Sequence, residues 1–234
     1  MDNKERELTQ QEKNSLVKKI IIRFSLLPIF IGLLILLPAG TFNYWQVYLY
    51  LVVIVIPMLF VLLYFYRNNP KFLERRIRTK EREKQQKIIQ LIFSIFFFSG
   101  YVISGFDKRF GWSNISTNIV IIADIFVLLG YIMVFFVFKQ NSYASRIVEV
   151  EKNQKVITSG LYKYVRHPMY TGIIIMFSPT SIALGSYWGL ISMATIPVAL
   201  ILRLLNEEKV LCKELPGYKD YCQTTKYRLI PFIW

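Results

Sequence analysis

The apolar residues of this chain stand in long blocks separated by short polar stretches. A helix needs about 20 mostly apolar residues to cross a bilayer, and it satisfies its own backbone N–H and C=O groups, which lipid cannot do. Four blocks meet this requirement: Ile20–Pro38, Trp45–Tyr66, Ile88–Phe106 and Ile119–Phe138. The pattern therefore predicts an all-α, polytopic membrane protein with about five to six hydrophobic segments.

A fifth apolar stretch, Thr171–Leu202, is longer and is interrupted by Pro179, Gly185 and Pro197. Gly185 and the serine after it are typical of a turn, so we expect a C-terminal helical hairpin. Each arm would have about 15 residues and span about 22 Å, which is short for a full crossing and suggests a tilted or kinked pair. The alternative is one long tilted helix, which would place the C-terminal tail on the other side of the membrane.

The formal net charge is +14, and its placement indicates a membrane orientation rather than a nucleic-acid partner. Nine basic residues lie in 67–87, directly between two apolar blocks, where the positive-inside rule expects the cytoplasm. The N-terminal arm, the connection 139–170 and the tail after the hairpin are also basic, so all four segments are predicted to be cytoplasmic.

This reading divides the chain into a cytoplasmic arm (1–19), four transmembrane helices (20–138) and a C-terminal region (139–234) that holds the membrane hairpin 171–202 and a cytoplasmic tail. The polar residues before the first block argue against a cleavable signal peptide.

Few residues outside the C-terminal region suggest chemistry. Cys212 and Cys222 are the only cysteines, and they lack the further Cys or His residues that a zinc site requires, so we predict reduced thiols and no metal. Asp124 falls near the expected outer end of the fourth span, where a carboxylate reaches the interface, and we interpret it as structural.

Two polar clusters in the C-terminal region could carry function. The first, SGLYKYVRHPMYTG at Ser159–Gly172, contains His167, the only histidine, followed by Pro168, which suits the first turn of a helix. Unpaired N–H groups at such a helix start suit an anion or a polar ligand, whereas the alternative is an ordinary interfacial belt of aromatic and basic residues. In the second cluster, Arg203 and Glu207 are four residues apart on one helix face and could pair or jointly hold a ligand.

Together these motifs resemble the isoprenylcysteine carboxyl methyltransferase family and its phospholipid N-methyltransferase relatives. The resemblance covers about residues 153–234 and consists of several ordered motifs at suitable separations, which is more specific than any one motif. The matching elements are Gly160 with Tyr162, R-H-P-x-Y-x-G at Arg166–Gly172, R-x-x-x-E-E at Arg203–Glu208, and the late elements Gly217–Tyr221 and Arg228–Pro231.

The resemblance implies a cofactor, S-adenosyl-L-methionine, held in a cytoplasmic pocket of the 139–234 region. It implies these cofactor-binding residues: Gln154, Lys155, Val156, Ile157, Tyr162, His167, Pro168, Met169, Tyr170 and Glu207. It places Arg203 on the substrate side, and we take Arg203, Arg166 and His167 as the catalytic candidates. The family commonly has His where this sequence has Gln154, although Gln also donates and accepts hydrogen bonds.

The implied reaction is methylation of a lipophilic acceptor that arrives from the bilayer, such as the carboxylate of a prenylated cysteine-like compound or a related lipid. A carboxylate acceptor is already ionised at neutral pH, whereas an amine would need His167 or a tyrosine as a base. Two alternatives remain: an NADPH-dependent reductase of the membrane sterol reductase type, whose tail is similar, and a scaffold or transporter without enzymatic activity. Transporters usually place polar groups in mid-membrane, and these blocks are almost free of them.

Overall fold

The computed structural model describes residues 10–77, 84–143, 150 and 154–234, and the regular structure of these residues is helical throughout. The predicted all-α fold is therefore confirmed for this part of the chain. The elements are α1 (Gln10–Ala39), α2 (Trp45–Asn68), α3 (Pro70–Ile77), α4 (Lys84–Phe110), α5 (Thr117–Gln140), η1 (Gly160–Lys163), α6 (Pro168–Phe177), α7 (Thr180–Ala183), α8 (Gly189–Met193), α9 (Thr195–Glu214) and α10 (Tyr218–Thr224).

Four helices in the described residues are long and apolar enough to cross a membrane: Trp45–Asn68, Gln90–Phe110, Thr117–Gln140 and Gly189–Glu214. The first three agree with predicted spans. The first predicted span lies within α1, whose described apolar part, Phe24–Ala39, is shorter. Helix α1 begins at Gln10, before the predicted start at Ile20, while 1–9 of the predicted arm and 78–83 of the basic connection lie outside the described residues.

Large apolar side chains cover the outer surfaces of these helices. Leu37, Ile56, Leu91 and Ile191 are each at least 61% exposed. In water, such continuous apolar exposure would be a strong aggregation hazard, whereas a bilayer accommodates it. The helices therefore have the surface of a multi-pass membrane protein.

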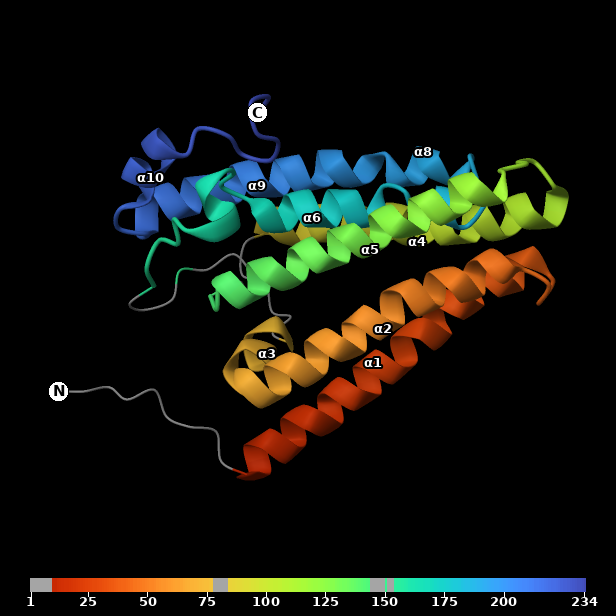
Figure 1. Ribbon diagram of the computed structural model, residues 1–234, viewed down its shortest axis with the longest axis horizontal. Helices are drawn as coiled ribbons and strands as arrows, with labels where there is room; N and C mark the ends of the chain where they lie inside the picture. Colours follow the sequence, from red (N-terminus) through yellow and green to blue (C-terminus); the bar gives the residue numbers. More distant parts are fainter. Residues whose placement is uncertain (1–9, 78–83, 144–149, 151–153) are drawn as a thin grey trace.

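The stretch Thr171–Leu202 folds as a hairpin and not as one long helix. Helices α6 and α7 run away from the end of the molecule that carries α10 (Figure 1). The chain turns at Gly185 with a φ of +75°, and α8 and α9 return to that end. The return arm is longer than the predicted 15 residues. The apolar pattern ends at Leu202, but the helical hydrogen bonds continue through the charged residues as far as Glu214.

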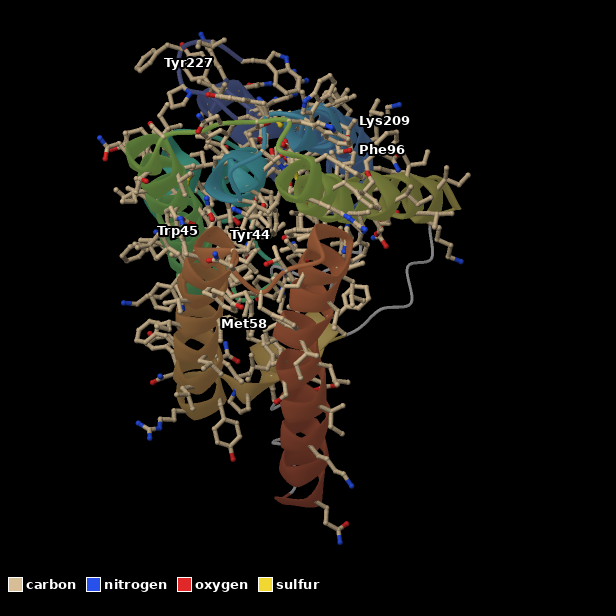
Figure 2. All side chains as sticks on the ribbon, turned by 90° about the vertical axis from the view of Figure 1, so that its right-hand side faces the viewer. Tyr44, Trp45, Met58, Phe96, Lys209 and Tyr227 are labelled. Atoms are coloured by element: carbon tan, nitrogen blue, oxygen red, sulfur yellow. The ribbon has the colours of Figure 1, made fainter. Side chains whose placement is uncertain are left out.

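The α1–α2 pair packs on one side of a layer formed by the other long helices (Figure 1). Figure 2, which views the molecule along the long axis of Figure 1, shows Tyr44 where the pair meets that layer. The Tyr44 hydroxyl donates to the Ser104 carbonyl at 3.2 Å and also to the Leu184 carbonyl. This buried tyrosine thus joins the start of α2 to α4 and to the hairpin turn.

The hairpin is held against α5 by a close helix crossing. A Cβ on Gly130 of α5 would lie 2.4 Å from the Met176 backbone nitrogen, and a Cβ on Gly172 of α6 would lie 2.8 Å from a methyl group of Val134. Small residues at a helix crossing allow backbones to approach, as is common in membranes. This contact fixes α6, and therefore the residues before it, relative to α5.

We expect Gly130→Ala to destabilise the protein by about 2 kcal/mol or more, because backbone atoms of α6 occupy the space that the new Cβ needs. Thermal unfolding in detergent would measure the change. Gly32→Ala is the matched control, since a Cβ there meets only a leucine methyl at 3.9 Å. Equal melting temperatures for both variants would contradict this packing.

Candidate active site

A polar pocket lies at the end of the molecule that carries α10 (Figure 1). It brings together residues from the end of α5, the 154–157 segment, η1, the start of α6, the second half of α9 and α10. Its lining includes most of the residues predicted from the sequence: Gln154, Lys155, Val156, Ile157, Tyr162, Arg166, His167, Met169, Tyr170, Arg203 and Glu207. Pro168 does not line it, because it fills the first position of α6 with its ring buried.

The turn η1 positions Tyr162. Gly160 begins the turn with a φ of +62°, a conformation that favours glycine, and a Cβ there would clash with the Gln140 side chain. Gln140 Oε1 accepts a hydrogen bond from the Leu161 N–H at 2.9 Å, and Asn141 Nδ2 donates to the Tyr162 hydroxyl at 2.8 Å. Burial raises the pKa of Tyr162 to about 12, so the phenol stays protonated at neutral pH.

Glu208 is the centre of a buried charge cluster behind the pocket. Its Oε1 accepts from Arg166 Nε at 2.7 Å and lies 3.2 Å from His167 Nε2, and its Oε2 accepts from Arg228 Nε at 2.8 Å. Arg166 is 8% exposed and also donates to the Thr225 and Lys226 carbonyls. Burial lowers the pKa of the Arg166 guanidinium, but the bond to Glu208 outweighs this effect and the net pKa is raised.

The same segment is tied to the C-terminal tail through its backbone. The Arg166 and His167 N–H groups donate to the Tyr227 and Arg228 carbonyls at 2.9 and 3.0 Å, and the Thr171 hydroxyl donates to the Leu229 carbonyl at 2.8 Å. These hydrogen bonds from the C-terminal tail therefore fix the position of the start of α6. These contacts favour an anchoring role for Arg166, whose predicted catalytic role stays a prediction.

His167 lies between the charge cluster and the pocket wall. Its Nε2 is 3.4 Å from the Tyr218 hydroxyl as well as close to Glu208, and its ring stacks with Tyr170 at a centroid distance of 5.7 Å. The ring is 6% exposed. The stacking with Tyr170 and the two polar groups beside Nε2 together hold the His167 ring in one orientation.

Tyr170 connects Glu207 with Arg203 across the pocket. The Tyr170 hydroxyl donates to Glu207 Oε2 and accepts from Arg203 Nε at 3.1 Å. Glu207 and Glu208 are neighbours in α9, yet Glu208 is committed to the buried cluster whereas Glu207 lines the pocket. Glu207 is therefore the carboxylate that a bound ligand would meet.

A second, mostly apolar pocket adjoins the first. It lies between α4, α6 and α9 and shares Met169, Tyr170 and Arg203 with the polar pocket. Its remaining lining residues are Arg76, Gln90, Phe93, Ser94, Ile173, Phe177, Ala199 and Leu200. A polar ligand and an apolar ligand could thus meet at the side chains of Tyr170 and Arg203.

Sequence reasoning missed part of the polar pocket. Its lining also includes Asn141, Tyr143, Leu211, Leu215, Tyr218 and Tyr221. The Gly217–Tyr221 motif was a signal for the last two, but nothing in the sequence marks Asn141 and Tyr143, which reach the pocket only because α5 ends beside η1.

The lining residues of the polar pocket offer groups that suit an organic ligand. No group of three or more His, Cys, Asp or Glu side chains that could hold a metal occurs in the described ranges. Cys212 and Cys222 are free thiols, as predicted, and burial raises the pKa of Cys222. Carboxylate, phenol, amide and exposed backbone groups are instead the partners of amino, ribose and base groups.

Comparison with known proteins supports this interpretation in the same part of the chain. Residues 118–216 match the model of a family described as phospholipid methyltransferase. The predicted likeness to the phospholipid N-methyltransferases is therefore confirmed over that segment, which includes η1, the hairpin and all of α9. No curated protein sequence matches the chain.

One similar solved structure is described as the eukaryotic intramembrane Ras methyltransferase ICMT (isoprenylcysteine carboxyl methyltransferase) without a monobody. It is 17% identical, and the likeness covers 96% of this chain and 88% of that chain with a TM-score of 0.46. A likeness at this level does not assign a function.

Removing the Glu208 carboxylate should loosen the tail. We expect Glu208→Ala to cost about 3 kcal/mol or more of stability, because it leaves the buried Arg166 charge without its partner. Thermal unfolding and limited proteolysis of the C-terminal tail would measure this. Glu214→Ala, an exposed carboxylate near the end of the same helix, should change neither readout. An intact tail in the Glu208 variant would contradict the anchoring role.

Proposed function

We propose that this chain is an integral membrane methyltransferase that uses S-adenosyl-L-methionine and methylates a lipophilic acceptor at the cytoplasmic face. The proposal rests on the way the predicted cofactor-binding residues come together in one pocket. Residues 154–157, Tyr162, His167 and Tyr170 line one polar pocket together with Glu207, which lies 37 residues after Tyr170 in the sequence, and this pocket adjoins an apolar one. The methyltransferase family match over 118–216 supports the same reaction class.

The residues of the polar pocket fit such a cofactor. Glu207 would bind its amino group or ribose hydroxyls, since its carboxylate faces the pocket. The tyrosine rings of Tyr162, Tyr218 and Tyr221 line the same space and provide faces that attract a sulfonium cation. When bound, this cofactor supplies an electrophilic methyl group, and the reaction needs no metal.

The acceptor would occupy the apolar pocket with its reacting group beside Arg203. Two arginines, Arg76 and Arg203, line that pocket, and none of its described lining residues is acidic. This charge favours an anionic acceptor, such as the carboxylate of a prenylated cysteine-like compound, over an amine. A carboxylate is ionised at neutral pH, so these residues need only orient it. Correct alignment of the two reactants then supplies much of the acceleration.

The orientation in the membrane follows from charge. Helices α3 and α10 lie at the same end of the molecule (Figure 1), and the basic segments predicted to be cytoplasmic flank them. This end carries the polar pocket, so a water-soluble cofactor would enter from the cytoplasm while the acceptor arrives from the bilayer between helices.

Cofactor binding is the first test. Calorimetric titration of detergent-purified protein with S-adenosyl-L-methionine and S-adenosylhomocysteine should show binding, and Glu207→Gln should weaken it about tenfold or more through the loss of a charged hydrogen bond. Glu214→Gln is the matched control and should bind like the wild type, because Glu214 is exposed outside the pocket. NADPH is titrated in parallel: binding of NADPH alone would instead favour a reductase, and binding of none of the three compounds would favour a scaffold.

The acceptor pocket can be tested separately. We expect Ala199→Phe to fill it and to raise the KM for a prenylated N-acylcysteine about tenfold or more, with cofactor affinity unchanged. Its neighbour Val198 is 58% exposed on the outer surface, so Val198→Phe should leave both values unchanged. Methyl-transfer kinetics with a radiolabelled cofactor would measure the difference, and equal KM values for the two variants would rule out this pocket.

A further inference from the structure

A second polar cluster lies inside the helices, apart from both pockets, where α2, α4, α5 and α7 meet. Asp124 of α5 is 3% exposed, so the expectation that it reaches the interface is wrong. Neither of its carboxylate oxygens has a hydrogen-bond partner among the described residues. A carboxylate buried in a membrane protein without a partner is costly and marks a candidate functional site.

The hydroxyl groups beside Asp124 are already engaged with one another. The Tyr50 hydroxyl lies 2.7 Å from the Tyr101 hydroxyl and 3.3 Å from Thr180 Oγ1, and Thr180 in turn reaches the Met176 carbonyl at 3.5 Å. Each hydroxyl has one proton to donate. Because this series of hydrogen bonds ends on the Met176 carbonyl, the hydroxyl protons are used within the series. Lone pairs of the hydroxyl oxygens remain without a donor. Asp124 interacts electrostatically with Tyr50 but receives no hydrogen bond from it.

Other buried oxygens without a hydrogen-bond partner among the described residues are Gln46 Oε1, one turn before Tyr50 in α2, and the hydroxyls of Ser178 and Ser181, close to Thr180 in the sequence. Asp124 thus carries two unpartnered carboxylate oxygens beside a Tyr50–Tyr101–Thr180 group whose hydrogen bonds are made among themselves and to a carbonyl. No described ion pair involves Asp124. What completes such a site is a positively charged ligand that binds oxygen.

Asp107 shows how this fold treats a carboxylate that is only structural. It is 1% exposed, and it accepts hydrogen bonds from the Ser113 N–H at 2.7 Å, from the Ser113 hydroxyl at 2.6 Å and from the Ser186 hydroxyl. The protein therefore provides donors where a buried carboxylate serves packing. None of the described residues donates a hydrogen bond to Asp124.

We propose that Asp124 is the anionic ligand of a small monovalent cation such as Na⁺, with the hydroxyl oxygens of Tyr50 and Thr180 as further ligands. Hard cations bind carboxylate, carbonyl and hydroxyl oxygens. A single carboxylate neutralises a single positive charge, whereas a divalent ion would leave a net charge buried away from water. The bound ion would link α5 to α2 and to α7, and so would brace the hairpin that carries the start of the polar pocket.

The test is thermal unfolding of the detergent-purified full chain in NaCl and in choline chloride at equal ionic strength. Na⁺ at ten times its dissociation constant should raise the melting temperature by about 3 to 5 °C over choline. Asp124→Asn should abolish this increase, and Thr180→Val, which removes one ligand oxygen, should weaken it if the first variant folds poorly. Scintillation binding of ²²Na⁺ to the wild type gives a readout that does not depend on any variant.

Asp107→Asn is the matched control, because it alters a buried carboxylate that already has its donors, and it should keep the Na⁺ response. A melting temperature that is equal in Na⁺ and choline, together with no ²²Na⁺ binding, would overturn the proposal and indicate a neutral, protonated Asp124. So would a Na⁺ response that survives in Asp124→Asn. None of these outcomes depends on S-adenosyl-L-methionine binding, so the cation site and the proposed methyltransferase activity are tested independently.

Discussion

The candidate site depends on the buried ion pair between Glu208 and Arg166. Glu208 also contacts His167 and Arg228, so one carboxylate joins α9, the segment before α6 and the C-terminal tail. Burying these charges is tolerable only because each has a partner and Nη1 of Arg166 also donates to two backbone carbonyls. Without this cluster, the residues that line the polar pocket would have no common frame.

The adjacent carboxylate has a different part in the site because of helix geometry. Successive residues of a helix point about 100° apart, so Glu207 faces the pocket while Glu208 faces the tail. Tyr170 holds Glu207 and Arg203 together at the wall that the two pockets share. In the proposed methyltransferase, this wall is where a polar cofactor and an apolar acceptor would meet, which gives a physical reason for placing the site at a membrane surface.

The membrane-embedded part serves mainly to fix the position of the hairpin. Close packing at Gly130 and Gly172 sets α6 against α5, and Tyr44 with Asp107 secures the turn at the far end. The Asp124 cluster lies between these two attachments along α5 and α7. The residues that stabilise the helix packing therefore differ from those that line the polar pocket, although the hairpin contributes residues to both sets.

The sequence by itself determined the helical membrane architecture, because lipid forces long apolar blocks into helices, and it determined most lining residues of the polar pocket, because their motif order is specific. Only the tertiary structure decided how far α9 continues past Leu202, which glutamate faces the pocket, that Arg166 anchors the tail, and that Asn141 and Tyr143 join the site. It also placed Asp124 inside the protein and not at the interface. The physical reason is that an apolar pattern records what each residue must avoid, whereas pairing, burial and pocket geometry depend on which distant helices pack together.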